Sequence, residues 1–354
     1  MIFRDRALPR AVDLLEQAVD TENEALLNDA FHQLRDAMDK SQDKTCVAAG
    51  PRLAALLPRT PLGAAAILAV MIGACVERGA DPSVCAGPVF DRLEDALTNV
   101  AGFPALWAKT VGGELPVRNH LELGEALGSI AEVTGGVDEA TFAAVSAWME
   151  LPLWEMAAVA MLSHEPIRLL VQEEGSLVAL ADAVAMGAAD LKCLRHLLKM
   201  FEAEPLVVVH RPTGTAYRMR MSRLGDNFQL HTLLAHHLVG GGHVPGSAPS
   251  ADAVAAVRDA DVSPDAPPQT VGSFNLCAAD GTWIWNEGCP ADIPVVDGER
   301  LLILDPPTYE RSWKSFRFYP HITGDLVLEK VLDRAEAAAY LAKAAPPRRW
   351  PDGS

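Results

Sequence analysis

Cysteine is scarce in this chain of 354 residues. The six cysteines stand singly and no CxxC pair occurs, so the sequence is not that of a disulfide-stabilised secreted domain. The first residues lack the uninterrupted apolar core of a signal peptide. One uncharged stretch of 17 residues, 60–76, lies at the short limit for a membrane span, and its Gly and Ala content favours a buried core helix instead. We therefore expect a cytoplasmic protein.

Basic residues are also few. The chain has 30 Lys and Arg against 47 Asp and Glu, which gives a formal net charge of -17. The electrostatic field of this negative charge repels nucleic-acid phosphates and anionic membrane surfaces. We therefore expect neither a nucleic acid nor a membrane as partner.

Several motifs that carry chemistry are absent. The sequence contains no GxGxxG after a strand, no GxxxxGK[ST], no GxSxG, no HExxH and no EF-hand loop. Dinucleotide enzymes, P-loop NTPases, α/β-hydrolases and zincins are therefore disfavoured, and the sequence indicates no cofactor.

What the sequence does have is an ordinary globular composition, with 49% hydrophobic and 22% charged residues, and a change of pattern near residue 202. Residues 1–201 predict an all-helical domain, an irregular bundle with helices at 120–133, 139–150, 153–162, 176–187 and 190–201, among others. Residues 202–345 predict a mainly antiparallel, meander-like sheet with one or two covering helices, so the fold class is α+β. Residues 240–270, rich in Gly, Pro and Ala, predict a long loop with one helical turn around 251–260, and 346–354 form a tail.

Local signals place several boundaries. Thr21 and Glu24 have the spacing of a capping box, and Asp81 before Pro82 predicts an N-cap with proline as first helical residue. Asp226 and Asp333 are expected to cap helices at about 227–239 and 335–344. Asp280-Gly281 and Asp297-Gly298 each lie between strand-like runs and predict two-residue hairpin turns.

Four histidines lie within 13 residues, at His231, His236, His237 and His243. Two helical residues share a face at spacings of three or four, and His231 lies five and six residues before the next two. The helix alone therefore cannot chelate a metal, and a site would need His210 or His321 from the sheet. We expect no metal site, and a metalloenzyme using these histidines remains a weaker alternative.

Arginines give the acidic chain a local positive charge. Residues 205–225 contain no acid, and Arg218 and Arg220 lie two apart on a predicted strand, so their side chains leave the same face. Two adjacent guanidiniums can bind a carboxylate or phosphate through bidentate hydrogen bonds. The alternative is that neighbouring Asp or Glu side chains pair with them on a half-solvated face.

A second basic island comprises Arg311, Lys314 and Arg317, which follow a Pro-rich loop that carries Tyr309. If this loop folds over the face of Arg218 and Arg220, the two islands form one mouth that attracts anions. Whether they meet in space is not fixed by the sequence.

Two tryptophans, Trp283 and Trp285, alternate on a predicted strand and share a face. They offer either an apolar stacking wall for a ligand or part of the sheet core.

These features lead to one main hypothesis, an enzyme or accessory protein that handles a small anionic molecule or peptide in a pocket between the two domains. Arg218, Arg220, Arg311 and Tyr309 would bind the ligand, Trp283 and Trp285 would form the wall, and His231 would carry the proton. The alternative is a non-enzymatic scaffold or regulator whose helical domain docks a protein partner.

Overall fold

A computed structural model describes residues 6–187, 190–263 and 265–348. Its internal contacts divide the chain into two compact units, Met1–Leu198 and Lys199–Ser354. The first unit is helical and the second contains the strands, so the α+β fold class is confirmed. Each unit is described by itself.

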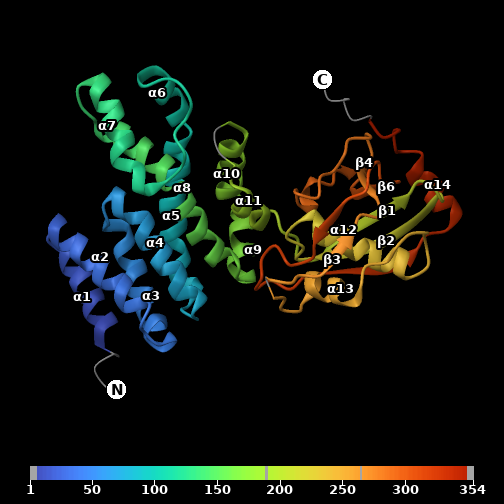
Figure 1. The fold of residues 1–354 in the computed structure, drawn as a ribbon, viewed down its shortest axis with the longest axis horizontal. Coiled ribbons are helices and arrows are strands. Elements are labelled where there is room, and N and C mark those ends of the chain that lie inside the picture. Colours follow the sequence, from blue (N-terminus) through green and yellow to red (C-terminus); the bar gives the residue numbers. More distant parts are fainter. Residues whose placement is uncertain (1–5, 188–189, 264, 349–354) are drawn as a thin grey trace. The chain divides into compact units, whose positions relative to one another are not determined.

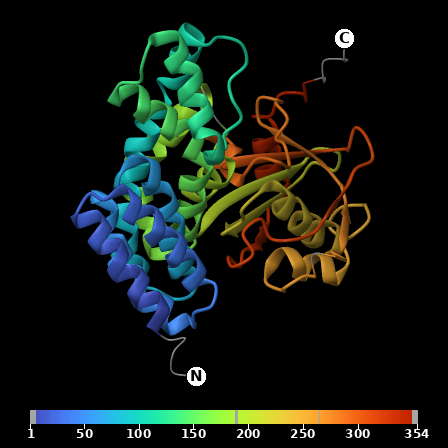
Figure 2. The same cartoon turned by 60° about the vertical axis from the view of Figure 1, so that its left-hand side comes forward.

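The helical unit contains α1 to α11 (Figure 1). Their bounds are α1 Ala7–Asp20, α2 Glu24–Met38, α3 Asp43–Leu56, α4 Leu62–Glu77, α5 Pro82–Val100, α6 Phe103–Thr110, α7 Leu123–Thr134, α8 Glu139–Leu162, α9 Glu165–Glu174, α10 Ser176–Gly187 and α11 Lys192–Leu198. Short 3-10 turns at Leu57–Arg59 and His120–Glu122 precede α4 and α7. The long helix α8 packs against α4 and α5 (Figure 2).

Local signals in this unit are partly confirmed. Asp81 caps α5, because its side chain accepts a hydrogen bond from the Ser83 amide. The capping box at Thr21 is wrong, since α1 runs to Asp20 and Asn23 caps α2 instead. The predicted break before residue 153 is also wrong, because α8 continues through Pro152. The uncharged stretch forms the buried helix α4, and no helix in the described part of the chain is long and apolar enough to cross a membrane.

The second unit is built on a mixed sheet with strand order β4-β6-β1-β2-β8 and β5 paired to β6, beside a two-stranded sheet of β3 and β7 (Figure 1). The bounds are β1 Glu204–His210, β2 Thr215–Ser222, β3 Gln269–Val271, β4 Asn275–Ala278, β5 Val295–Val296, β6 Glu299–Asp305, β7 Ser312–Lys314 and β8 Asp325–Val331. Most pairs are antiparallel, but β6 lies parallel to β1. The meander is therefore wrong: β1 and β2 form a hairpin, and the chain returns through helices before β6 pairs with β1.

Helices cover both faces of this sheet. On one face α12 (Asn227–Ala235), a π-helical turn (His236–Gly240) and α13 (Ala251–Arg258) pack on side chains such as Val208 and Met219. On the other face α14 (Arg334–Leu341) packs on side chains such as Val207 and Val209. Successive residues of a strand point to opposite faces, so β1 contributes to both cores. The predicted long loop 240–270 thus contains an eight-residue helix, α13.

One of the two predicted turns and both predicted caps in this unit follow their sequence signals. At Asp280-Gly281 only the glycine has a positive φ angle, so the two-residue hairpin turn expected there is wrong. Asp297 and Gly298 have positive φ angles, 52° and 85°, and connect β5 to β6 as a tight hairpin. Asp226 caps α12 and Asp333 caps α14 as predicted. Trp283 forms only an isolated bridge to Cys277, so the predicted strand through Trp283 and Trp285 is wrong. Of the predicted tail, residues 349–354 lie outside the described residues.

Candidate functional site

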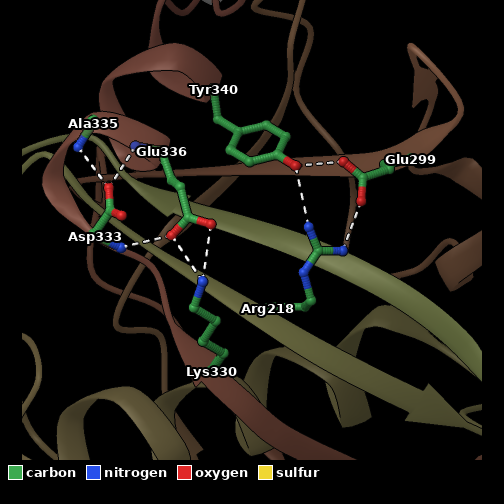
Figure 3. A network of polar contacts seen from close by, with 7 residues as sticks. All are labelled: Arg218, Glu299, Lys330, Asp333, Ala335, Glu336 and Tyr340. Atoms are coloured by element: carbon green, nitrogen blue, oxygen red, sulfur yellow. Dashed lines mark hydrogen bonds and ion pairs between the residues drawn. The ribbon is translucent and has the colours of Figure 1, made fainter.

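Arg218 lies on β2 and reaches across β1 to a carboxylate on β6. Its Nη1 is 2.6 Å from Oε1 of Glu299, and its Nη2 donates to the Tyr340 hydroxyl at 3.3 Å (Figure 3). The Tyr340 hydroxyl in turn donates to the second oxygen of Glu299. The bonds from Tyr340 and then Arg218 hold the pKa of the Glu299 carboxyl below its ordinary value. The charge of Arg218 is therefore balanced within the protein.

Arg220 also has a carboxylate partner, since its Nε is 2.6 Å from Oε1 of Glu329 on β8. The structure thus shows the alternative arrangement for both arginines, in which each pairs with its own acid. We therefore exclude Arg218 and Arg220 from the site proposed below. Another strand of the sheet supplies the partner in each case, β6 for Arg218 and the neighbouring β8 for Arg220, and strand order is not visible in one sequence.

His231 is fully buried on α12, between two aromatic rings. Its ring stacks on Phe274 at 5.6 Å between centroids and meets Trp313 edge-on at 4.8 Å. The ring Nε2 accepts hydrogen bonds from the backbone amides of Ser273 and Phe274, at 3.2 and 3.3 Å. Burial, and then the charge of Arg311, lower the pKa of His231 to about 3.

This arrangement keeps the imidazole neutral and its Nε2 occupied as the acceptor of two hydrogen bonds. A proton carrier needs a ring nitrogen that faces its substrate and a pKa near the working pH. His231 has neither, so we treat it as a structural residue that fixes the loop before β4.

Arg311 and Tyr309 lie near His231. Arg311 Nη2 donates to the carbonyl of Phe274 at 2.7 Å, and its guanidinium lies 5.6 Å from the Tyr309 ring centroid. Arg311 Nε is buried without a hydrogen bond in the described part of the chain. Of the predicted residues, the structure brings His231 and Arg311 together at Phe274, and Tyr309 lies beside Arg311.

The two tryptophans lie side by side, with ring centroids 6.0 Å apart, although no strand carries them. Trp283 packs against the core on the α14 face, and Trp285 is 43% exposed. Ile284 between them packs on the opposite core. His231 and Trp283 therefore lie on different faces of the sheet and do not line one pocket.

Sequence reasoning could have detected this separation. Tyr217, Met219 and Met221 alternate with the arginines and face α12, the helix that carries His231. Arg218 and Arg220 must then leave the other face. The period-two pattern alone places these arginines opposite Tyr217, Met219 and Met221, and the packing of α12 on that second face places them opposite the histidine.

A cavity of about 540 Å³ lies instead beside the second basic island. Its lining residues come from the end of α13, the loop that follows it, the last residue of β7 and the segment after β7: Ala256, Ala260, Asp261, Val262, Ser263, Pro267, Lys314, Phe316, Arg317 and Pro320. Its wall is mostly apolar, and Phe316 is half exposed. The volume lies within the range typical of small-molecule sites.

The two cations of the cavity differ in their partners. Arg317 is buried, and it donates to the carbonyls of Ala260 and Pro320 and to Asp261 Oδ1 at 3.0 Å. Lys314 is exposed and forms no ion pair or hydrogen bond with the residues that the structure describes. The cavity therefore has one uncompensated cation at its wall.

The histidine cluster shows no common ligand geometry. His237 Nε2 lies 2.5 Å from the Leu326 carbonyl oxygen, and His243 meets the Tyr217 ring edge-on. Within residues 6–187, 190–263 and 265–348, no three His, Cys, Asp or Glu side chains form a group that could hold a metal ion. The metalloenzyme alternative therefore gains no support.

No protein-family model matches the chain, no curated protein matches it, and no solved structure matches it. Function is therefore inferred below from the side chains and cavities alone.

Proposed function

We propose that the second unit binds a small anionic ligand with an apolar body in the cavity beside Lys314. The observation that supports this most directly is the combination of a mostly apolar wall with one unpaired ammonium group. A ligand anion at Lys314 gains a charge-assisted hydrogen bond, while its apolar part is removed from water against Phe316 and Pro267. This keeps the predicted ligand class and moves its site to the second basic island.

The proposed role of this cavity is to bind the ligand without catalysing a reaction on it. In the cavity lining, Asp261 is paired with Arg317, and Lys314 is an exposed amine. Neither forms the coupled acid and base that general acid–base catalysis uses. An accessory or sensing protein therefore fits the lining better than an enzyme does.

The test uses 4-phenylbutanoate and its uncharged amide as probes, titrated by calorimetry into the full chain. We expect the acid to bind and the amide to bind at least tenfold more weakly, because a hydrogen bond to a charged group contributes about 1.5 kcal/mol. Lys314→Met is expected to remove this preference. Lys109→Met, an exposed lysine of the helical unit, changes the net charge equally and is expected to leave it intact.

Two outcomes oppose the proposal. Equal binding of acid and amide to the unaltered protein would show that Lys314 does not interact with the charge of the ligand. No binding of either probe, or of a longer phenylalkanoate, would remove the cavity as a ligand site.

A second candidate function is docking of a protein partner by the helical unit. It is favoured by exposed apolar side chains at and before α7, namely Val117, Leu121 and Val133. Changing these three to serine should abolish such docking and leave binding of 4-phenylbutanoate unchanged, whereas Lys314→Met should do the reverse.

The expected cytoplasmic location belongs to the same proposal. All six cysteines are free, and five of them are buried. Free thiols are typical of a reducing compartment and support that expectation.

A further inference from the structure

A small cavity, mostly apolar but with a few polar groups in its wall, lies inside the helical unit, where α8 packs against α5 and the start of α4. Its volume is about 20 Å³, enough for one water molecule. The residues that line it are Leu62, Arg92, Asp95, Ala96, Asn99, Ala143, Ser146, Ala147, Glu150 and Trp154. It is therefore too small for a substrate but large enough for a single bound water.

Two polar side chains of α8 line this cavity and have no hydrogen-bond partner among the described residues. Ser146 is 1% exposed, and its hydroxyl has no hydrogen bond within the described part of the chain. Glu150, one turn later on the same helix face, is 3% exposed, and no hydrogen bond from the described residues reaches its carboxyl group. Buried polar groups are normally satisfied, so both point to an occupant that hydrogen-bonds to them.

The charged groups that line the cavity with Glu150 both come from α5. Arg92 donates from Nη2 to the Thr60 carbonyl at 3.2 Å, and Asp95 is exposed at the rim. From α4 only Leu62 lines the cavity. No guanidinium is therefore hydrogen-bonded to the Glu150 carboxyl among the described residues, and Arg92 acts on it only through its charge.

We propose that this cavity is a proton-binding site, in which the neutral Glu150 carboxyl group and the Ser146 hydroxyl share one water molecule, and that loss of the proton loosens α8 from α5. Desolvation supports the choice of the neutral form, because burial raises the pKa of Glu150 to about 7, against a smaller opposing effect of Arg92. The folded protein then takes up this proton near neutral pH. Its packing at α5 and α8 becomes a function of pH in that range.

The direction in which stability changes with pH follows from the difference between the folded and unfolded pKa of Glu150. An unfolded glutamate loses its proton near pH 4.5, whereas the folded one keeps it to about pH 7. The contribution of Glu150 to stability is therefore complete below pH 4.5 and is lost as the pH rises through 7. Above that pH a buried carboxylate remains, without a bonded cation.

The first measurement is a carbon-13 NMR titration of glutamate carboxyl groups in the full chain, assigned with Glu150→Gln. We expect the resonance missing from the variant to titrate near pH 7. A midpoint near 4.5 for that resonance would overturn the proposal.

The second measurement is amide hydrogen exchange, corrected for the intrinsic effect of pH. Protection of α5 and α8 should fall severalfold between pH 6 and 8 in the unaltered protein and in Glu132→Gln, an exposed control on α7. In Glu150→Gln it should stay constant. If the amide protection of α5 and α8 in the unaltered protein does not change with pH, the proposed loosening of α8 from α5 is wrong.

If Glu150→Gln does not fold, Ser146→Ala decides the matter. Loss of the hydroxyl removes one partner of the shared water, and the Glu150 midpoint should move upward because its ionised form is less well solvated. An unchanged midpoint shows that no water is shared.

Discussion

The chemistry of a histidine depends on what its two ring nitrogens contact. At His231 the Nε2 accepts two backbone N–H groups, so the proton must lie on Nδ1, which faces Asn286 Oδ1 at 3.4 Å. The ring therefore orders the backbone at Ser273 and Phe274 and does not titrate near neutrality. Spacing along the helix excluded chelation correctly, but it carried no information on partners contributed by residues more than forty positions away.

His231→Ala should therefore lower stability and leave ligand binding unchanged. The variant leaves two buried N–H groups without an acceptor and opens a cavity, which together cost about 2–4 kcal/mol in free energy of unfolding. His321→Ala, an exposed histidine, should change it by less than about 0.5 kcal/mol. Urea denaturation checks both, and equal effects of the two variants would refute the structural role.

The same histidine gives a pH dependence opposite to that of Glu150. Its folded pKa of about 3 lies below the unfolded value of 6.5. Its contribution to stability is therefore complete above pH 6.5 and is lost as the pH falls toward 3. His231→Gln should flatten the acid side of the stability profile, measured by denaturation between pH 4 and 7, and an unchanged slope would contradict this.

At the scale of elements, α14 is held to the sheet by polar contacts as well as by its apolar face. The Asp333 carboxylate caps the helix by accepting hydrogen bonds from the amides of Ala335 and Glu336, and the Glu336 carboxylate accepts one from the Asp333 amide (Figure 3). Lys330 of β8 pairs with Glu336, while Tyr340 joins Arg218 to Glu299 from the other end of the helix. The arginine that suggested a ligand site thus serves to dock a helix.

Tyr340→Phe tests this docking with the ring retained. Loss of the hydroxyl should lower the free energy of unfolding by about 1 kcal/mol, since Arg218 and Glu299 are partly exposed and keep their own ion pair. Faster amide exchange should be confined to α14. Tyr309→Phe, whose hydroxyl has no hydrogen bond among the described residues, is the matched control and should change neither quantity.

Elements governed by local chemistry were mostly predictable, the capping box at Thr21 being an exception, and those governed by distant partners were not. The turn at Asp297-Gly298 and the cap at Asp226 depend on a few neighbouring residues, and both were placed correctly. The parallel pairing of β6 with β1 depends on a return of the chain over almost ninety residues. Pro152 was interpreted as a helix boundary, but α8 is continuous through this proline. Helix α8 packs against α4 and α5, and such tertiary packing can override a local helix-breaking preference.

The candidate site follows the same division. Composition identified the acid-free run that contains Lys314 and Arg317, and both residues line the cavity. The opposite wall comes from the segment 240–270, which was expected to be mainly loop, and contains Ala256, Ala260, Asp261, Val262, Ser263 and Pro267. That wall was missed because its residues form no recognisable chemical motif.

At the scale of the whole molecule, charge and core are distributed unequally. Residues 1–201 carry 28 acids and 16 bases, a net charge of -12, which leaves -5 for residues 202–354 out of the total of -17. The less acidic second unit has apolar cores on both faces of its sheet and contains the cavity with Lys314. A unit with its own core can fold alone, and lower negative charge reduces repulsion of an anionic ligand.

Residues 199–354, expressed alone, should therefore fold and bind 4-phenylbutanoate with a Kd within about threefold of the full chain, a difference below about 0.7 kcal/mol. Near-ultraviolet circular dichroism reports the packing of Trp283, Trp285 and Trp313, and calorimetry reports the binding. A folded fragment with unchanged binding places the site within this unit, whereas a folded fragment that has lost binding shows that the helical unit contributes to it. An unfolded fragment contradicts the independence of its core, because every residue of both apolar clusters lies within residues 199–354.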